Sequence, residues 1–173
     1  MVGFLSLNVV ENPGGTPITS PPKGISKMTP KQLVEQVTAL TGFTNSSGVQ
    51  VLIAEPGHVN LLLAKKPELL QFNGFFHGGV VSGLADHAAG AAATTALPAG
   101  RIAVTIDLHV SFLSPANGQS IIAKAKAIQV GSTVCVVAVE VTTTFDGEEK
   151  LCALATVTLR VVDMPPFKKA PKL

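Results

Sequence analysis

Residues 77–97, "HGGVVSGLADHAAGAAATTAL", constrain the fold more than any other stretch of the chain. The stretch is rich in alanine, is apolar on nearly every face of a helix, and is followed by Pro98 and Gly100, which stop a helix. A helix that is apolar all round is buried rather than laid on a surface. A hairpin precedes it and four strands follow it, so the sequence predicts an α+β fold in which a curved antiparallel sheet wraps around one long central helix.

The other elements follow from local patterns. Thr29, Pro30 and Gln32 form a helix start with a capping box, and Gly42 marks the expected exit of that helix. Apolar runs separated by turn residues predict a hairpin of strands 49–54 and 58–64, a short helical turn near "KPELL", and four further strands at 101–113, 119–130, 133–145 and 150–162. We expect an irregular segment over 1–28, one domain over 29–163, and a loose tail over 164–173.

Composition excludes several functional classes. The 173 residues are 46% hydrophobic and 14% charged, which predicts a folded core. A net charge of +2 without Trp or Tyr gives no basis for nucleic-acid binding, and no apolar run has the length of a membrane span. The two cysteines, Cys135 and Cys152, lie in apolar strands and predict reduced thiols in a cytoplasmic protein, an expectation that the absence of early Lys or Arg at the N-terminus also favours. The histidines share no metal spacing, so no metal is expected.

Asp86 is the residue that packing alone does not explain. It lies among valine, leucine and alanine in the predicted helix. Removing an ionised carboxylate from water without a partner costs several kcal/mol or more. The side chain therefore faces solvent or a neighbouring hydroxyl, or it occupies a place where its charge is used.

Two motifs together carry a resemblance to a known family. "FHGGVVSGLADHAAGAA" at 76–92, followed by "TIDLHVSFLSPA" at 105–116, resembles the hotdog-fold acyl-CoA thioesterases of the phenylacetic-acid-degradation (PaaI-like) and 4-hydroxybenzoyl-CoA thioesterase superfamily. The similarity extends over about residues 49–162. It implies a hotdog fold, hydrolysis of an acyl-CoA thioester without metal or cofactor, coenzyme A as part of the substrate, and a site between the subunits of a homodimer or homotetramer.

The spacing of Gly78 and Asp86 tests that last implication. Eight residues on one helix separate them by about 12 Å along the axis, which is too far for both to act on one thioester carbon. If two copies of the helix run antiparallel across a two-fold axis, Gly78 of one chain faces Asp86 of the other. We expect the backbone N–H of Gly78 to polarise the carbonyl and Asp86 to act as general base or as nucleophile.

The resemblance implies roles for further residues. Gln71, six residues before the histidine, corresponds to a position that places substrate or water, with Asn73 as the second choice. Thr105 corresponds to a hydroxyl that orients water, and His77 is expected to fix the entry loop. Coenzyme A would also need cations or free backbone N–H groups for its phosphates, so turn residues are further candidates. The candidate substrate contacts are Asn73, Gly79, Gly131, Ser132, Thr133 and Pro115. Each has a structural alternative, such as tight packing at the glycines or a solvent face at the polar positions.

Two other functions stay open from the sequence. The first is a hotdog hydratase or dehydratase, although its D-x-x-x-x-H or H-F-P-x-x-P arrangement is absent. The second is a non-catalytic acyl-CoA binding protein. The acyl group is not fixed either, because candidate lining residues such as Phe75, Val80, Val81 and Leu84 suit an aromatic or an aliphatic group equally.

Overall fold

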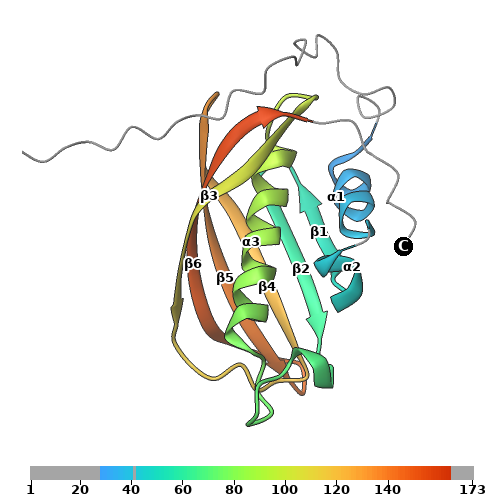
Figure 1. Cartoon of the computed structure of the whole chain (residues 1–173), viewed down its shortest axis with the longest axis vertical. Helices are drawn as coiled ribbons and strands as arrows, with labels where there is room; N and C mark the ends of the chain where they lie inside the picture. Colours follow the sequence, from blue (N-terminus) through green and yellow to red (C-terminus); the bar gives the residue numbers. More distant parts are fainter. Residues whose placement is uncertain (1–27, 41, 165–173) are drawn as a thin grey trace, which may run out of the picture.

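A six-stranded antiparallel sheet wraps around one long helix in the computed structural model, which describes residues 28–40 and 42–164. The elements in chain order are α1 (Pro30–Thr38), α2 (Phe43–Ser47), β1 (Gln50–Glu55), β2 (His58–Ala64), a 3₁₀ turn η2 (Pro67–Leu69), α3 (Gly78–Thr95), β3 (Arg101–Phe112), β4 (Ser120–Val130), β5 (Val134–Phe145) and β6 (Glu148–Asp163). Figure 1 shows the sheet curving behind α3, with α1 and α2 beside β1. The predicted α+β hotdog architecture is confirmed.

The sheet has the strand order β1-β2-β4-β5-β6-β3. β1 and β2 form the predicted hairpin, and β2 then pairs with β4. β3 follows the helix in the chain but pairs with β6, so β3 lies at one edge of the described sheet. This crossover places β3 alongside α3, where its first residues approach the middle and the end of the helix.

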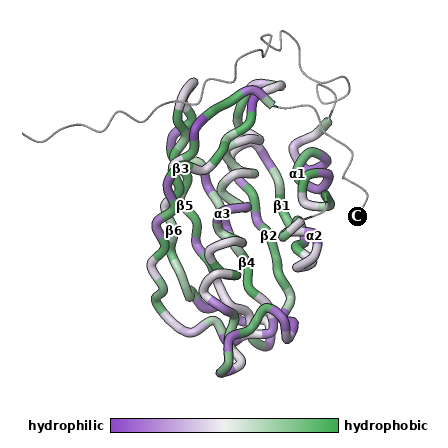
Figure 2. The backbone as a smooth tube through the Cα atoms, in the orientation of Figure 1, coloured by the Kyte–Doolittle hydropathy of each residue, from purple (hydrophilic) through white to green (hydrophobic). Residues whose placement is uncertain are grey.

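The buried face of α3 explains its alanine content. Seven residues of the helix pack against the sheet: Val81, Leu84, Ala85, Ala88, Ala89, Ala92 and Ala93. Methyl side chains let a helix and a curved sheet approach closely, and the interior packs densely as a result. Figure 2 shows that the apolar course of α3 is interrupted by a hydrophilic stretch near its middle. Asp86 and His87 are hydrophilic residues in the middle of α3, and neither is fully buried.

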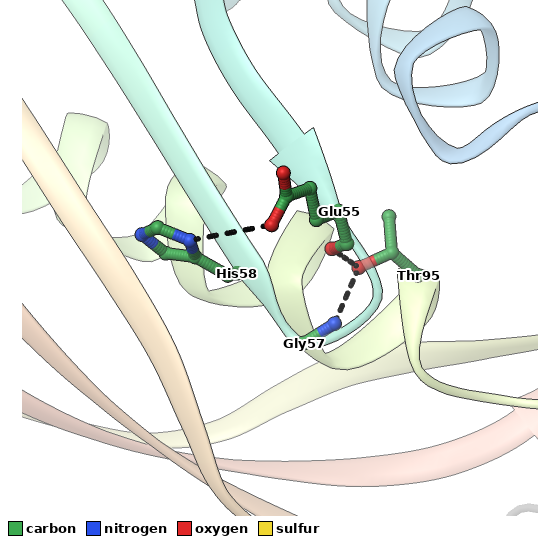
Figure 3. A network of polar contacts seen from close by, with 4 residues as sticks. All are labelled: Glu55, Gly57, His58 and Thr95. Carbon is green, nitrogen blue, oxygen red and sulfur yellow. Dashed lines mark hydrogen bonds and ion pairs between the residues drawn. The ribbon is translucent and has the colours of Figure 1, made fainter.

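The C-terminal end of α3 is fastened to the β1–β2 hairpin. Figure 3 shows Thr95 Oγ1 accepting a hydrogen bond from Gly57 N–H at 3.2 Å and lying 3.1 Å from the carbonyl oxygen of Glu55. The same turn carries the close pair His58 and Glu55, with 4.0 Å between Nδ1 and Oε2. The helix therefore ends against a fixed turn.

The first helix begins as predicted and ends earlier. Thr29 and Gln32 form both hydrogen bonds of the capping box. α1 ends at Thr38 instead of continuing to Gly42, and a second helix, α2, follows it. Gly42 has φ of 151°, a backbone conformation that side-chain-bearing residues rarely adopt, so it starts α2 after a break rather than closing α1.

Both cysteines lie in the core as free thiols. Cys135 on β5 and Cys152 on β6 are 0% and 1% exposed. Cys152 Sγ donates a hydrogen bond to the carbonyl oxygen of Val141 at 3.2 Å, and burial raises the pKa of this thiol. The expectation of unpaired buried cysteines is confirmed for this chain.

The limits of the domain fall partly outside the described residues. The segment expected to be irregular, 1–28, is described only at Met28, and the expected tail, 164–173, only at Met164. Met164 is buried and its N–H donates to the carbonyl oxygen of Gly100. Within the described ranges, no helix has the length and apolarity needed to cross a membrane.

Candidate active site

Asp86 and Thr105 form a direct pair between the central helix and the edge strand. Asp86 is half-buried on the side of α3 that faces α1 and the first half of β3. Thr105 Oγ1 donates a hydrogen bond to Asp86 Oδ1 at 2.7 Å. Among the described residues Oδ2 has no hydrogen-bond partner. One oxygen of the carboxylate is thus held in place while the other is available.

A β-bulge lies next to this pair. The register of β3 against β6 shifts between Thr105 and Asp107, so Ile106 has no Cα partner there. Bulges bend a strand and re-aim its side chains, and they are frequent beside active sites. No residue type in "TID" is typical of a bulge, so the bulge could not be predicted from the sequence.

A cavity of about 680 Å³ opens at Asp86. α1 forms one wall, the exposed face of α3 forms the floor, and the first half of β3 forms the other wall. The lining residues are Leu33, Val34, Val37, Leu40, Asp86, His87, Gly90, Ala91, Thr94, Thr95, Ile102, Ala103, Val104, Thr105 and Met164. Gly78 does not line it. Val81 and Leu84 were expected as lining residues and are instead packed in the core against the sheet.

The start of α3 presents an unused backbone donor. His77 is the N-cap residue, and its Nδ1 accepts a hydrogen bond from Gly79 N–H at 2.9 Å. The N–H of Gly78 has no acceptor among residues 28–40 and 42–164. The Phe112 ring lies 3.3 Å from the position that a Cβ at Gly78 would take, so a larger residue there would displace the ring. A free N–H at the positive end of a helix dipole suits an anionic oxygen.

His87 joins the site without having been assigned to it from the sequence. Its Nε2 lies 2.9 Å from Thr38 Oγ1, so it connects α3 to the end of α1. Burial lowers the pKa of His87, and the neighbouring charge of Asp86 opposes that shift in part. The only local signal for His87 was its place directly after Asp86 in the predicted helix.

The 71–76 turn holds the remaining catalytic candidates. Gln71 N–H donates to the carbonyl oxygen of Phe75, and Asn73 Oδ1 accepts from Phe75 N–H at 3.3 Å. Asn73 is exposed and serves the turn in this way, whereas the side chain of Gln71 is half-buried. Neither lines the cavity at Asp86.

The candidate substrate contacts lie at opposite ends of one protomer. Thr133, in the turn with Gly131 and Ser132, accepts a hydrogen bond from Val161 N–H near the start of β3. Pro115 is exposed beside Ala116, whose carbonyl oxygen accepts from Phe76 N–H next to the start of α3. A single chain therefore brings Asp86 together with Thr105, and Gly78 with His77 and Gly79, but it does not unite the two groups.

No metal cluster is present in the described part of the chain. Within it, no group of three or more His, Cys, Asp or Glu side chains is arranged to hold a metal ion. The hydrogen-bond donor at Asp86 is Thr105 rather than a set of metal ligands.

A curved antiparallel sheet wrapped around one long central helix is the hotdog fold. A profile of the Thioesterase superfamily matches residues 73–150. A Halobacterium salinarum protein that carries the name of an esterase is 38% identical over 129 residues, covering 69% of this chain and 84% of the relative. The 1,4-dihydroxy-2-naphthoyl-CoA hydrolase of Listeria monocytogenes is 27% identical over 69% of this chain and 95% of its own length.

The solved structures agree with these relatives. The crystal structure of a thioesterase family protein from Silicibacter pomeroyi has a TM-score of 0.75 and 30% identity, and it covers 78% of this chain and 99% of its own. The chain belongs to the thioesterase superfamily.

Proposed function

We propose that the protein hydrolyses an acyl-CoA thioester to a free acid and coenzyme A, with Asp86 as the acting acid. The observation that carries the proposal is the Asp86 carboxylate in the lining of a mostly apolar cavity, with Oδ1 held by Thr105 and Oδ2 without a hydrogen-bond partner among the described residues. Membership of the thioesterase superfamily supports the reaction class. The relative from Listeria, named as a CoA-thioester hydrolase, supports the choice of coenzyme A.

The chemistry needs two features on opposite sides of the thioester carbon. Asp86 takes a proton from water as the oxygen attacks, the C–S bond breaks, and the thiolate of coenzyme A takes up a proton. Alternatively, Asp86 attacks and forms a mixed anhydride that water then hydrolyses. In both routes negative charge develops on the carbonyl oxygen, and the free Gly78 N–H is the donor we assign to it. These groups suffice without a metal or cofactor, so we expect activity to survive treatment with a chelator.

The two features belong to different subunits in this proposal. Gly78 and Asp86 lie eight residues apart on one continuous helix, about 12 Å along its axis, and Gly78 does not reach the cavity at Asp86. An antiparallel pair of α3 helices about a two-fold axis brings them together twice. A homodimer is therefore part of the mechanism, and the sheet leaves an outer face for further pairing into a tetramer.

The edge strand favours such a dimer. β3 has a neighbour on one side only within the described sheet. Ile106 and Phe112 on this strand are 60% and 57% exposed, and Phe72, in the turn before α3, is 99% exposed. A long edge strand with exposed apolar side chains is a surface that proteins normally cover. Pairing of β3 with β3 of a second copy covers it.

The first test removes the acid. Asp86→Asn should lower the release of coenzyme A from acyl-CoA by a factor of at least about 10³, because the amide neither accepts the proton nor attacks. Glu140→Gln, which removes an exposed carboxylate on β5, is the matched control and should retain wild-type turnover. Binding of acyl-CoA and the dimer mass should be the same in both variants. Wild-type turnover in Asp86→Asn would refute the assignment, and hydration of enoyl-CoA without thiol release would identify a hydratase instead.

The second test asks whether the site is shared. Gly78→Val crowds Phe112 and blocks the approach to the N–H, so it should be inactive alone, as should Asp86→Asn. A mixed dimer of the two variants contains one site with Gly78 from one chain and Asp86 from the other. Random mixing should restore about a quarter of wild-type activity, since half of the dimers carry one intact site of two. No restored activity in a mixture shown by mass to contain mixed dimers would refute the shared site.

A further inference from the structure

We infer that the acyl chain of the substrate lies in the cavity along α3 from Asp86 toward Thr95, and that the substrate is a linear acyl thioester of about eight to ten carbons. Gly90 leaves the middle of the cavity open, so that the chain can extend past it toward Thr95. This inference rests on the proposed function, because it uses Asp86 to place the thioester carbon at the mouth of the cavity.

The length of the cavity follows from the helix. Asp86, Gly90 and Thr94 are spaced by four residues and line one face of α3, and Thr95 lines the far end. Nine residues from Asp86 to Thr95 span about 13 Å at 1.5 Å per residue. An extended chain advances about 1.2 Å per bond, as a polypeptide does over its three bonds per residue. A ten-carbon acyl chain has nine C–C bonds and spans about 11 Å at this rise, so it fits before the turn that Thr95 holds (Figure 3).

The walls are suited to a hydrocarbon. The lining side chains from α1 and β3 are mostly aliphatic: Leu33, Val34, Val37, Leu40, Ile102 and Val104. The polar groups beyond Asp86 already have partners inside the protein. Thr94 accepts a hydrogen bond from Ala103 N–H, Thr95 is bonded to the hairpin turn, and His87 is paired with Thr38. A ligand that brings polar groups into this space finds few free partners, whereas an alkyl chain requires none.

The volume favours a chain over a single ring. A cavity of about 150 Å³ is enough to bind benzene. The present cavity has about 680 Å³, within the usual range of sites for larger ligands. One aromatic ring would contact only part of the lining, and each missing contact forfeits dispersion energy. An elongated chain contacts both walls over the full length.

Gly90 keeps the middle of the cavity open. A Cβ built at Gly90 meets nothing within 4 Å, so no described neighbour requires a glycine there. Gly83 on the same helix is different, because a Cβ at Gly83 would lie only 3.0 Å from the Phe43 ring and would crowd it. Glycine in the interior of a helix is less favourable than alanine. The space beside Gly90 is therefore open, about 6 Å along the helix axis from Asp86. A larger side chain at position 90 would block an acyl chain there.

The experiment is a chain-length profile of kcat/KM for saturated acyl-CoAs from two to sixteen carbons, with phenylacetyl-CoA included. Each fully buried methylene raises affinity by up to about fourfold. Octanoyl has six more methylenes than acetyl, so even partial burial should raise kcat/KM at least about 100-fold between them, and kcat/KM should stop rising beyond ten carbons. Gly90→Leu should move the optimum to four to six carbons and lower the decanoyl-to-butanoyl ratio at least about tenfold. Gly90→Ala should lower that ratio less. Gln129→Leu places a leucine at an exposed position of β4 outside the cavity and should leave the profile unchanged.

The outcomes separate this inference from the proposed function. A flat profile, a preference for phenylacetyl-CoA, or an equal loss at all lengths in Gly90→Leu would overturn the inference while leaving thioester hydrolysis intact. Absence of hydrolysis with every acyl-CoA would refute the proposed function. Binding of decanoyl-CoA and acetyl-CoA to Asp86→Asn, measured by calorimetry, supplies a second readout. A decanoyl preference that Gly90→Leu removes would support the cavity as the acyl site independently of turnover, and equal affinities would contradict it.

Discussion

The hydrogen bond from Thr105 to Asp86 makes a prediction that can be worked from the structure. Its 2.7 Å length and its carboxylate acceptor place it among the charge-assisted bonds, which contribute about 1.5–3 kcal/mol. Thr105→Val removes the donor and keeps the shape of the side chain. If the bond holds Oδ2 toward the thioester, its loss costs that orientation at the transition state, and kcat should fall about 10- to 150-fold.

The assay compares kcat and KM of three proteins with a good acyl-CoA substrate. Thr105→Val should lose kcat with a change in KM of less than about threefold, because Thr105 acts through Asp86 as a positioning residue. Thr105→Ser keeps the hydroxyl and should recover most of the rate. Thermal unfolding and the mass of the assembly separate a local effect from loss of the fold.

Two results would refute this reasoning. If Thr105→Val keeps a kcat within about threefold of wild type, the bond does not orient the acting acid. If Thr105→Ser is as slow as Thr105→Val, the methyl group rather than the hydroxyl matters, and the role of Thr105 is packing against α3.

Three further predictions concern stability and assembly. Burial lowers the pKa of His87 in the folded protein, so the unfolded chain takes up this proton at a higher pH than the folded one does. The free energy of unfolding should therefore fall as the pH drops from the ordinary pKa of histidine toward the lowered pKa of the folded state. Urea titrations at several pH values measure this slope, and His87→Gln should flatten it. Leu84→Ala should lower the free energy of unfolding by about 2–5 kcal/mol, measured the same way, since Leu84 is fully buried between α3 and the sheet; a loss below about 1 kcal/mol would contradict that packing. Ile106→Lys should shift the assembly toward monomer in light scattering and lower activity in parallel, whereas a fully active monomer would end the case for a shared site.

The central helix α3 and the start of α1 were predictable because the residues that determine them are close together in the sequence. The run of alanines, the stop at Pro98 and the capping box of α1 each act within a few residues, and the structure has all three. The position of β3 beside β6 was not predictable in this way, because strand order depends on contacts between residues far apart in the chain. α2 is too short to give a periodic pattern.

The candidate site divides along the same line. Asp86 was conspicuous as a charge in an apolar helix, and Thr105 was suggested by the family resemblance. Their hydrogen bond lies beside the bulge in β3, and the cavity is lined by α1, α3 and β3 together. Neither feature could therefore be predicted from a single segment of the sequence. His87 was missed because its partner, Thr38, is 49 residues away.

The two thiols sealed between sheet and helix give the molecule an intrinsic reporter. Cys135 and Cys152 are the only cysteines in the sequence, and both are inaccessible in the native state. A thiol reagent can modify them only when β5 and β6 separate from α3, so the rate of labelling counts openings of the interior. Ligands that bind the closed form should slow that rate in proportion to their occupancy, which gives a measure of binding that needs no turnover.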